Sequence, residues 1–319
     1  MTDWHEIILS HKPPEGIWED VFTHLLQISK ESDSPVMLHK QTVVGDRLLA
    51  ESAWKLWGDY DGKATRTSNA LVNWWESQPA GINKAILILD ALSLRELTAI
   101  VGGGHAKGIE PVNISVTGSE VPSDTDQFAK ALGASSRSSL SNNAKSGSFK
   151  LGSAVYTDVM SHPFEDCIGS VPAVNDVFIW HTWLDDLIHL HKRLPDQIYK
   201  TATETFNSDG FWNFVNRMRQ GRKLIITADH GYAVSRLFST SVSGDAAEAL
   251  KKTFGAKRCT DDGQNWDTKL MPPMVLSQNG HHVVMGQTKW RVQGGFPQVC
   301  HGGLSLLEVA VPFIELPAI

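Results

Sequence analysis

Three short apolar runs of this chain each end at a side chain that can bind a metal ion or carry a proton. They span residues 84–89, 177–180 and 223–228 and are followed by Asp90, His181 and Asp229. Short continuous apolar runs are typical of strands that are buried on both faces of a sheet. Segments with helical periodicity lie between them, and this alternation predicts a mostly parallel α/β sheet covered by helices. Ligands of such sheets bind outside the carboxyl ends of the strands, where these polar side chains fall.

The periodicity divides the chain into two regions. Residues 1–80 are predicted to be mostly helical, since apolar side chains recur at helical spacing in several segments. These segments are residues 18–29, 48–57 and 68–75. Residues 81–319 are predicted to form the α/β domain, in which residues 94–101 form a helix closed by the glycines that follow. Residues 232–285 are irregular and polar, and we expect them to form an inserted lobe of this domain.

Composition narrows the class of function. The chain has 319 residues with 29 Lys and Arg against 35 Asp and Glu, and its formal charge of −6 argues against a protein that coats DNA through a basic surface. Its three cysteines are far apart, so they predict neither a disulfide framework nor a cysteine-rich zinc module. No apolar stretch is long enough for a membrane span and no signal peptide is visible, so we expect a cytoplasmic protein.

Several Asp and His side chains follow strands or lie at turns, in an order that suits metal binding. They are Asp90, Asp185, His189, Asp229, His230 and His301. Asp185 and His189 are four residues apart, so on a helix they share one face and can bind one cation. Taken singly, Asp90 is explained as a helix cap and His301 as a turn residue before Gly302. As a set, they predict a site for two divalent cations, the usual arrangement for displacement at phosphorus.

This ordered set resembles the alkaline phosphatase superfamily, and within it the PglZ branch of bacterial phage-defence systems. Four stretches carry the resemblance, namely residues 85–94, 177–189, 223–232 and 301–314. The most branch-specific piece is His-Gly-Gly-Leu-Ser at 301–305, followed by an acidic residue and an apolar Val-Pro run. The Asp-His-Gly after a strand is the most superfamily-specific piece. The resemblance covers roughly residues 84–319 and leaves residues 1–80 uncovered.

The resemblance implies a three-layer sandwich, with a mostly parallel sheet between two layers of helices, and two metal sites. The ligand sets that it implies are Asp185, His189 and His301 for one ion and Asp90, Asp229, His230 and the nucleophile for the other. The nucleophile of the family is a Ser or Thr at the start of a helix after the second strand. Thr125 fits that place best, and Ser123 is the alternative. His181, four residues before Asp185, is expected to orient a ligand.

A hydroxyl at that place suits nucleophilic attack for reasons independent of the family. Near a helix N-terminus it lies beside free backbone N–H groups that bind a phosphoryl oxygen, and a metal ion lowers its pKa. Without the metal set, the same residues would be explained as helix caps. Arg137 and Lys145 in the Ser-rich loop 134–149 either hold phosphate oxygens or are solvated loop charges. Cys300 beside His301 is either a ligand or a buried structural thiol.

These observations predict a metal-dependent phosphodiesterase or nuclease, in which Thr125 attacks phosphorus and two divalent cations stabilise the charge, with Zn²⁺ the first candidate and Mn²⁺ the second. The resemblance implies a nucleic-acid or oligonucleotide substrate and a role in anti-phage defence, with residues 1–80 available to other defence proteins. Basic residues of the lobe either follow a phosphate backbone or form a solvated face. They are Lys251, Lys252, Lys257 and Arg258. The alternatives are a phosphomonoesterase or sulfatase of the same superfamily, and a non-catalytic scaffold of a defence complex with a structural metal site.

Overall fold

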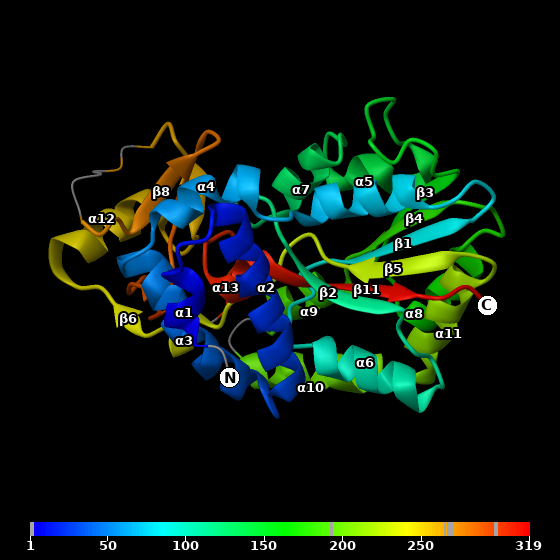
Figure 1. The fold of residues 1–319 in the computed structure, drawn as a ribbon, viewed down its shortest axis with the longest axis horizontal. Helices are drawn as coiled ribbons and strands as arrows, with labels where there is room; N and C mark the ends of the chain where they lie inside the picture. The colour runs from blue at the N-terminus through cyan, green and yellow to red at the C-terminus, as the bar shows by residue number, and fades with distance from the viewer. Residues whose placement is uncertain (1–2, 192–193, 265, 267–270, 297–298) are drawn as a thin grey trace.

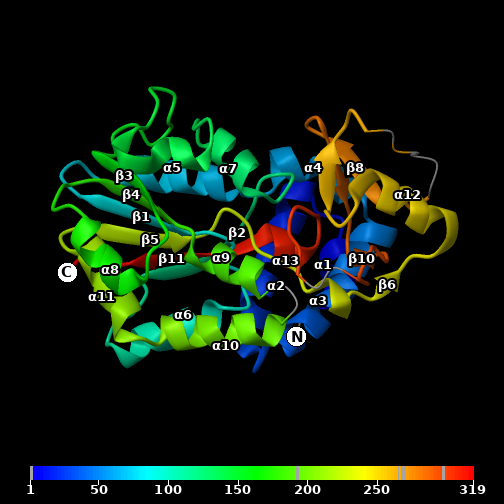
Figure 2. The same ribbon diagram turned by 180° about the vertical axis from the view of Figure 1, so that it is seen from behind.

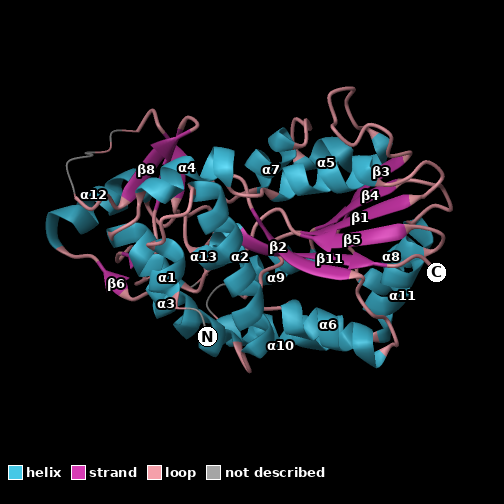
Figure 3. Cartoon of the chain, in the orientation of Figure 1, coloured by secondary structure: helices cyan, strands magenta, loops and turns pink. Residues whose placement is uncertain are grey.

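A six-stranded sheet forms one half of the structure, and helices α1 Trp4–Ile8, α3 Pro35–Glu51, α4 Lys55–Lys63 and α12 Gly244–Phe254 lie in the other half (Figures 1 and 3). The computed structural model describes residues 3–191, 194–264, 266, 271–296 and 299–319. The strands of the sheet are β1 Lys84–Leu89, β2 Asn113–Gly118, β3 Tyr156–Met160, β4 Val177–His181, β5 Lys223–Thr227 and β11 Ala310–Leu316. Their order is β2-β11-β5-β1-β4-β3. β1, β3, β4 and β5 are parallel, and β11 is antiparallel to both neighbours. The predicted mostly parallel sheet is confirmed.

Helices bury both faces of this sheet, as the continuous apolar runs predict (Figures 1 and 2). On one face lie α5 Thr67–Ser77 and α7 Thr125–Ala131, and on the other lie α6 Leu97–Ala106, α8 Phe164–Cys167, α10 Pro195–Phe206 and α11 Asp209–Arg219. Side chains of β1 alternate between two apolar clusters. Ile86 and Ile88 pack with Phe128 of α7, whereas Leu87 belongs to the cluster that contains Phe214 of α11. This period of two is that of a strand buried on both sides.

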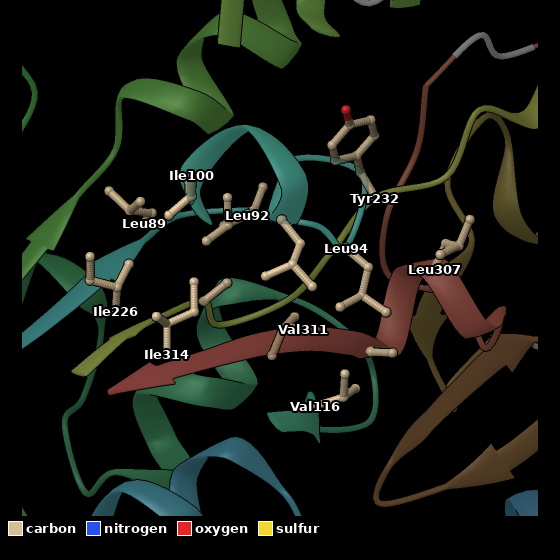
Figure 4. Close-up of a cluster of buried hydrophobic side chains, with 14 of the residues drawn as sticks. Leu89, Leu92, Leu94, Ile100, Val116, Ile226, Tyr232, Leu307, Val311 and Ile314 are labelled. Carbon is tan, nitrogen blue, oxygen red and sulfur yellow. The ribbon is translucent and has the colours of Figure 1, made fainter. Parts of the chain in front are cut away.

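The reversed strand β11 brings the end of the chain to the edge where the parallel strands finish. Its first residue, Ala310, pairs with Gly118, the last residue of β2. The short helix α13 Leu306–Val309 and the loop before it therefore lie at this edge. Figure 4 shows the core beneath it, where Leu92 and Leu94, just after β1, lie near Val311 of β11.

From residue 3, where the described chain begins, five helices precede the sheet. They are α1 Trp4–Ile8, α2 Pro14–Glu31, α3 Pro35–Glu51, α4 Lys55–Lys63 and α5. The predicted helices 18–29 and 68–75 are confirmed within α2 and α5, but a single helix over 48–57 is wrong. The N–H groups of Ser52 and Ala53 both donate to Leu48 O, which ends α3 before α4 begins. The apolar cluster of these helices includes sheet residues, and the domain boundary at residue 80 stays a prediction.

The glycines after residue 101 do not close a helix, contrary to the prediction. Helix α6 continues through Gly102, Gly103 and Gly104 to Ala106. A side chain at Gly103 would overlap the carbonyl of Phe206 and lie 2.8 Å from Trp212 Nε1. Glycine therefore lets α6 pack closely on its neighbouring helices rather than marking its end.

The lobe expected to be irregular has regular structure of its own. Its elements include β6 Thr240–Ser241, α12 Gly244–Phe254, β7 Cys259–Asp261, β8 Val275–Gln278 and β9 His281–Val284, and β10 Thr288–Lys289 follows just after the predicted end of the lobe. Strands β7, β9 and β8 form a small antiparallel sheet. Phe254 of α12, Val284 and Trp290 share its separate apolar cluster, which explains how a mostly polar segment folds.

Two further elements frame the carboxyl edge of the main sheet. Helix α9 Trp183–Leu190 follows β4, and the Ser-rich loop contains a short 3-10 helix at Arg137–Asn143. Among the helices of the described residues, none combines the length and the apolar character that a bilayer crossing requires.

Candidate metal centre

Two central strands each deliver a carboxylate to the carboxyl edge of the sheet. Asp90 follows β1 and Asp229 lies two residues after β5, and both side chains are fully buried. The N–H of Ala91, whose φ of 63° turns the chain out of β1, donates to Asp229 Oδ1 at 3.0 Å. A left-handed backbone is unfavourable for a residue other than glycine, so this turn is held by its surroundings. It holds the two acidic segments side by side.

His230 and Thr125 complete a cluster around these carboxylates. His230 Nε2 lies 3.4 Å from Asp229 Oδ2 and 3.9 Å from Asp90 Oδ1. Its Nδ1 lies 2.9 Å from Gly231 O, so a proton at Nδ1 leaves the Nε2 lone pair free for a metal ion. Thr125 Oγ1, on the first residue of α7, donates to Asp229 Oδ2 at 2.8 Å and lies 3.4 Å from His230 Nε2. It lies 3.5 Å from Asp90 Oδ1.

A second cluster joins helix α9 to the loop before α13. Asp185 and His189 lie one turn apart on α9, with Asp185 Oδ2 3.4 Å from His189 Nε2. One ligand atom from each of these residues and one from His301 all lie within 4.8 Å of one another. The same holds for the three charged groups of the first cluster. The structure therefore brings together both ligand sets that the sequence predicts.

The two clusters are neighbours. The rings of His230 and His301 stack with their centroids 4.4 Å apart. His301 also lies beside His189, at a centroid distance of 6.2 Å. The stacked pair joins the clusters into one centre that suits two ions, since paired metal ions in hydrolases lie about 3.5–4 Å apart.

Unsatisfied polar atoms in the second cluster fit a metal ion. Asp185 Oδ1 and His301 Nδ1 are buried, and no described residue hydrogen-bonds to either of them. A buried polar atom without a partner costs free energy, and coordination would remove that cost. Burial and the neighbouring imidazoles of His230 and His189 lower the pKa of His301 to about 3, so its ring is neutral and can act as a ligand.

The carboxylates repel one another in a dry environment. Burial, and then the charge of Asp90, raise the pKa of Asp229 and of Asp185. Burial opposes the charged form of His230, but Asp229 and Asp90 outweigh it and raise its pKa. Divalent cations would relieve this repulsion, because Asp and His together are ligands that Zn²⁺ and Mn²⁺ both accept.

Asp90 has two partners that the sequence did not single out for this role. Trp180 Nε1 donates to Asp90 Oδ2 at 2.9 Å, and Arg137 forms an ion pair with the same oxygen. Arg137 was predicted to hold phosphate oxygens or to be a solvated loop charge. Its guanidinium is half-buried at the centre, where Asp90 outweighs the effect of burial and raises the pKa of the side chain, so it is not a solvated loop charge, and its role toward phosphate stays a prediction. The apolar pattern of β4 gave no sign that Trp180 would contact a carboxylate.

Ser123 and Thr125 occupy different places. Ser123 Oγ is buried, donates to Gly303 O at 2.8 Å and accepts from Gly302 N at 3.1 Å. Its hydroxyl thus ties the chain before α7 to the loop that carries His301. The Thr125 hydroxyl alone of the two contacts the candidate ligands, as far as the described contacts go.

His181 packs away from the metal ligands. Its ring stacks on Phe164 at 4.2 Å, its Nδ1 accepts from Trp183 N at 3.2 Å, and its Nε2 lies 3.8 Å from Cys167 Sγ. No described contact of the ring reaches a candidate ligand. The ring instead contacts the start of α9, the helix that carries Asp185, and any effect on that ligand passes through the helix.

Two other candidates are not part of the centre. Lys145 Nζ donates to Asn143 Oδ1 at 3.1 Å in an exposed loop. Cys300 donates weakly to Ala233 O, and burial raises the pKa of its thiol to about 12, which favours the neutral structural thiol over the ligand.

No protein-family profile matches the sequence, and no curated protein matches it. Among solved structures, phosphonoacetate hydrolase from Sinorhizobium meliloti in complex with phosphonoacetate aligns with a TM-score of 0.43 and 12% identity, over 75% of this chain and 90% of that one. Murine ectonucleotide pyrophosphatase/phosphodiesterase 5 aligns with a TM-score of 0.39 and 12% identity, over 73% of this chain and 87% of that one.

Proposed function

We propose that this chain is a metal-dependent hydrolase of phosphodiesters and that Thr125 is its nucleophile. The observation that carries the proposal is the position of Thr125 Oγ1, within 2.8–3.5 Å of Asp229, His230 and Asp90. A hydroxyl in contact with three potential ligands of one ion is placed for activation and attack.

The candidate ligands form two sets, one for each ion. Asp90, Asp229 and His230 would hold one ion with Thr125, and Asp185, His189 and His301 would hold the second. Two divalent cations bound there would supply positive charge for the phosphoryl oxygens and lower the pKa of the hydroxyl. Zn²⁺ is the first candidate, because imidazoles make up half of the six Asp and His side chains of the centre.

Thr125 attacks phosphorus in line. Its Oγ1 forms the new bond to phosphorus as the bond from phosphorus to the leaving oxygen breaks. The Thr125 proton passes to Asp229 Oδ2, which already accepts that hydrogen bond at 2.8 Å, and then to the departing oxygen, which leaves as the alcohol. Water then attacks the phosphorylated Thr125, the bond from phosphorus to Oγ1 breaks, and the threonine regains its proton. The stacked His230 and His301 rings keep the two halves of the centre in register.

We further propose that the substrate is a nucleic acid or an oligonucleotide. The net charge of −6 includes carboxylates that bound cations would neutralise, so the centre would be locally positive despite the acidic chain. The proposed role in anti-phage defence, with residues 1–80 as the partner-binding region, rests on the motif resemblance to the PglZ branch. Cytoplasmic placement is part of the same proposal.

The test is a panel of esters. Purified protein loaded with Zn²⁺ or Mn²⁺ is assayed on bis-p-nitrophenyl phosphate, p-nitrophenyl phosphate, p-nitrophenyl sulfate and DNA, with and without chelator. We expect chelator-sensitive turnover that is faster on the diester than on the monoester or sulfate. The reverse preference would assign the monoesterase or sulfatase function, and no turnover with both ions bound would favour the scaffold.

A further inference from the structure

A cavity of about 720 Å³ adjoins the second ligand cluster. His189 and His301 line it, so it opens on the candidate metal centre. Lys257 of the lobe and Phe296, which comes shortly before His301 in the chain, also line it. Sites for organic ligands span about 300–1,000 Å³. A lone phosphate or sulfate group would leave most of this space empty, and the cavity therefore suits a substrate with a large organic part.

The structure separates the four basic residues of the lobe. Arg258 is buried in an ion pair with Glu308, so both predicted alternatives, contact with a phosphate backbone and a solvated face, are wrong for this residue. Lys251 Nζ lies 3.7 Å from Glu248 Oε2 on the exposed side of α12. Lys257 is exposed, lines the cavity and has no ion-pair partner among the described residues. Lys252 is exposed and does not belong to the described lining.

A second basic side chain, that of Arg291, lies close to the same cavity. The backbone of Val292 and Gly295 pairs through two hydrogen bonds of 2.8 and 3.0 Å, which makes a tight turn before Phe296. Arg291 lies over the Phe296 ring, with its Cζ 5.6 Å from the ring centroid. The carboxylate in the described lining belongs to Asp124, whose Oδ1 accepts from Gln127 N as the cap of α7.

We propose that the cavity is a subsite for a second phosphate of the substrate, held by Lys257 with Arg291 nearby. The inference rests on the proposed phosphodiesterase function and specifies its substrate as an oligonucleotide with more than one phosphate. Lysine and arginine are the side chains that recognise phosphate through charge-assisted hydrogen bonds. The organic part between the two phosphates occupies the mostly apolar remainder of the cavity.

The experiment compares thymidine dinucleotides that share one internal diester and differ in terminal phosphates. The substrates are TpT, pTpT and TpTp, with bis-p-nitrophenyl phosphate as the minimal ester. We expect kcat/KM for pTpT or TpTp to exceed that for TpT by about tenfold, which corresponds to about 1.4 kcal/mol of added transition-state stabilisation. In Lys257→Ala this ratio falls toward one, and Lys257→Arg restores it. Lys251→Ala, the matched control on the same lobe, keeps the wild-type ratio.

A binding measurement, which requires no turnover, accompanies the kinetics. Fluorescence anisotropy with a phosphorothioate pTpTpT measures binding by the metal-loaded protein at several salt concentrations. The slope of log K against log salt should fall by about one in Lys257→Ala and stay unchanged in Lys251→Ala.

Failure of the subsite and failure of the proposed function give different results. Turnover of the minimal ester with equal kcat/KM for all dinucleotides would remove the subsite and leave the proposed function intact. The subsite also fails if Lys251→Ala lowers the ratio as much as Lys257→Ala. If no ester is hydrolysed, the proposed function fails, and the anisotropy comparison decides whether the cavity binds a polyanion.

Discussion

The guanidinium of Arg258 and the carboxylate of Glu308 form a buried ion pair, with Nε 2.8 Å from Oε1. Glu308 Oε1 also accepts from Gly303 N at 3.0 Å, in the loop that carries His301. The carbonyl of Glu308 accepts from Gly231 N at 2.8 Å, directly after the histidine of the first cluster. One residue of α13 thus connects the lobe to both halves of the centre.

Replacing Glu308 with Gln should destabilise the protein and weaken its metal binding. Arg258 would keep a buried charge without its counter-charge, which costs about 3–5 kcal/mol. Urea unfolding measures the stability, and elemental analysis after dialysis measures the metal content. The matched control is Glu15→Gln, since the pair of Glu15 with Lys63 is exposed and should barely change the midpoint. Equal midpoints for both variants would contradict the role given to Glu308.

Asp185 and Asp186 should differ in their effect on metal content. Asp185 Oδ1 is buried without a described hydrogen-bond partner, whereas Asp186 Oδ2 accepts from Thr182 Oγ1 at 2.6 Å. Asp185→Asn should therefore lower the metal stoichiometry from two ions toward one, and Asp186→Asn should retain both. Elemental analysis of the two purified variants checks this. The ligand assignment fails if Asp186→Asn loses the ion and Asp185→Asn keeps it.

Asp46 should make stability depend on pH. Its carboxyl is buried between Leu306 N, at 2.7 Å, and Gln287 Nε2, at 2.8 Å, and burial raises its pKa from 3.8 to about 7. The folded state therefore holds this proton more tightly than the unfolded chain. This tighter proton binding stabilises the folded state to its full extent below pH 3.8, and the stabilisation is lost as the pH rises through about 7.

Asp46→Asn should remove this part of the pH dependence. The asparagine Oδ1 can still accept from Leu306 N, and its amide can donate to Gln287 Oε1, which is buried without a described partner. The free energy of unfolding in urea, measured at pH 5 and pH 8, should fall less between the two pH values in the variant than in the wild type. Parallel pH profiles would show that Asp46 does not titrate in this way.

Neighbouring glycines of α6 should respond in opposite directions to alanine. At Gly103 a Cβ would lie 2.8 Å from Trp212 Nε1 and still closer to the Phe206 carbonyl, so Gly103→Ala should cost about 1–3 kcal/mol. At Gly102 a Cβ meets no atom within 4 Å, and alanine should add about 0.5–1 kcal/mol of stability. Thermal unfolding of both variants distinguishes these effects. A similar loss in both would mean that helix packing is not what selects glycine at 103.

Local patterns predicted the sheet and placed the candidate ligands at its carboxyl edge, because both depend on short segments. A buried parallel strand needs a continuous apolar run, and the residue after it must lie at the carboxyl edge. Asp90 and Asp229 were found in this way, and the i, i+4 spacing identified Asp185 and His189 on one helix face.

Contacts between distant segments could not be predicted in the same way. Arg137 reaches Asp90 across 47 positions, and Arg258 reaches Glu308 across 50. A basic side chain in a polar segment looks solvated until the fold places a buried carboxylate beside it. The glycines of α6 were wrongly predicted to end the helix for a related reason, because the helices on which they pack follow about 100 residues later in the sequence.

We expect Thr125 to attack phosphorus within a two-ion centre. The most direct measurement is the hydrolysis of bis-p-nitrophenyl phosphate by wild type and Thr125→Ala, with the metal content of both proteins determined in the same preparations. Ser123→Ala is the comparison, because its hydroxyl holds the loop of His301 instead. We expect Thr125→Ala to bind metal but to lose at least about 1,000-fold in kcat, as expected for a nucleophile. Full activity of a metal-loaded Thr125→Ala protein would contradict it.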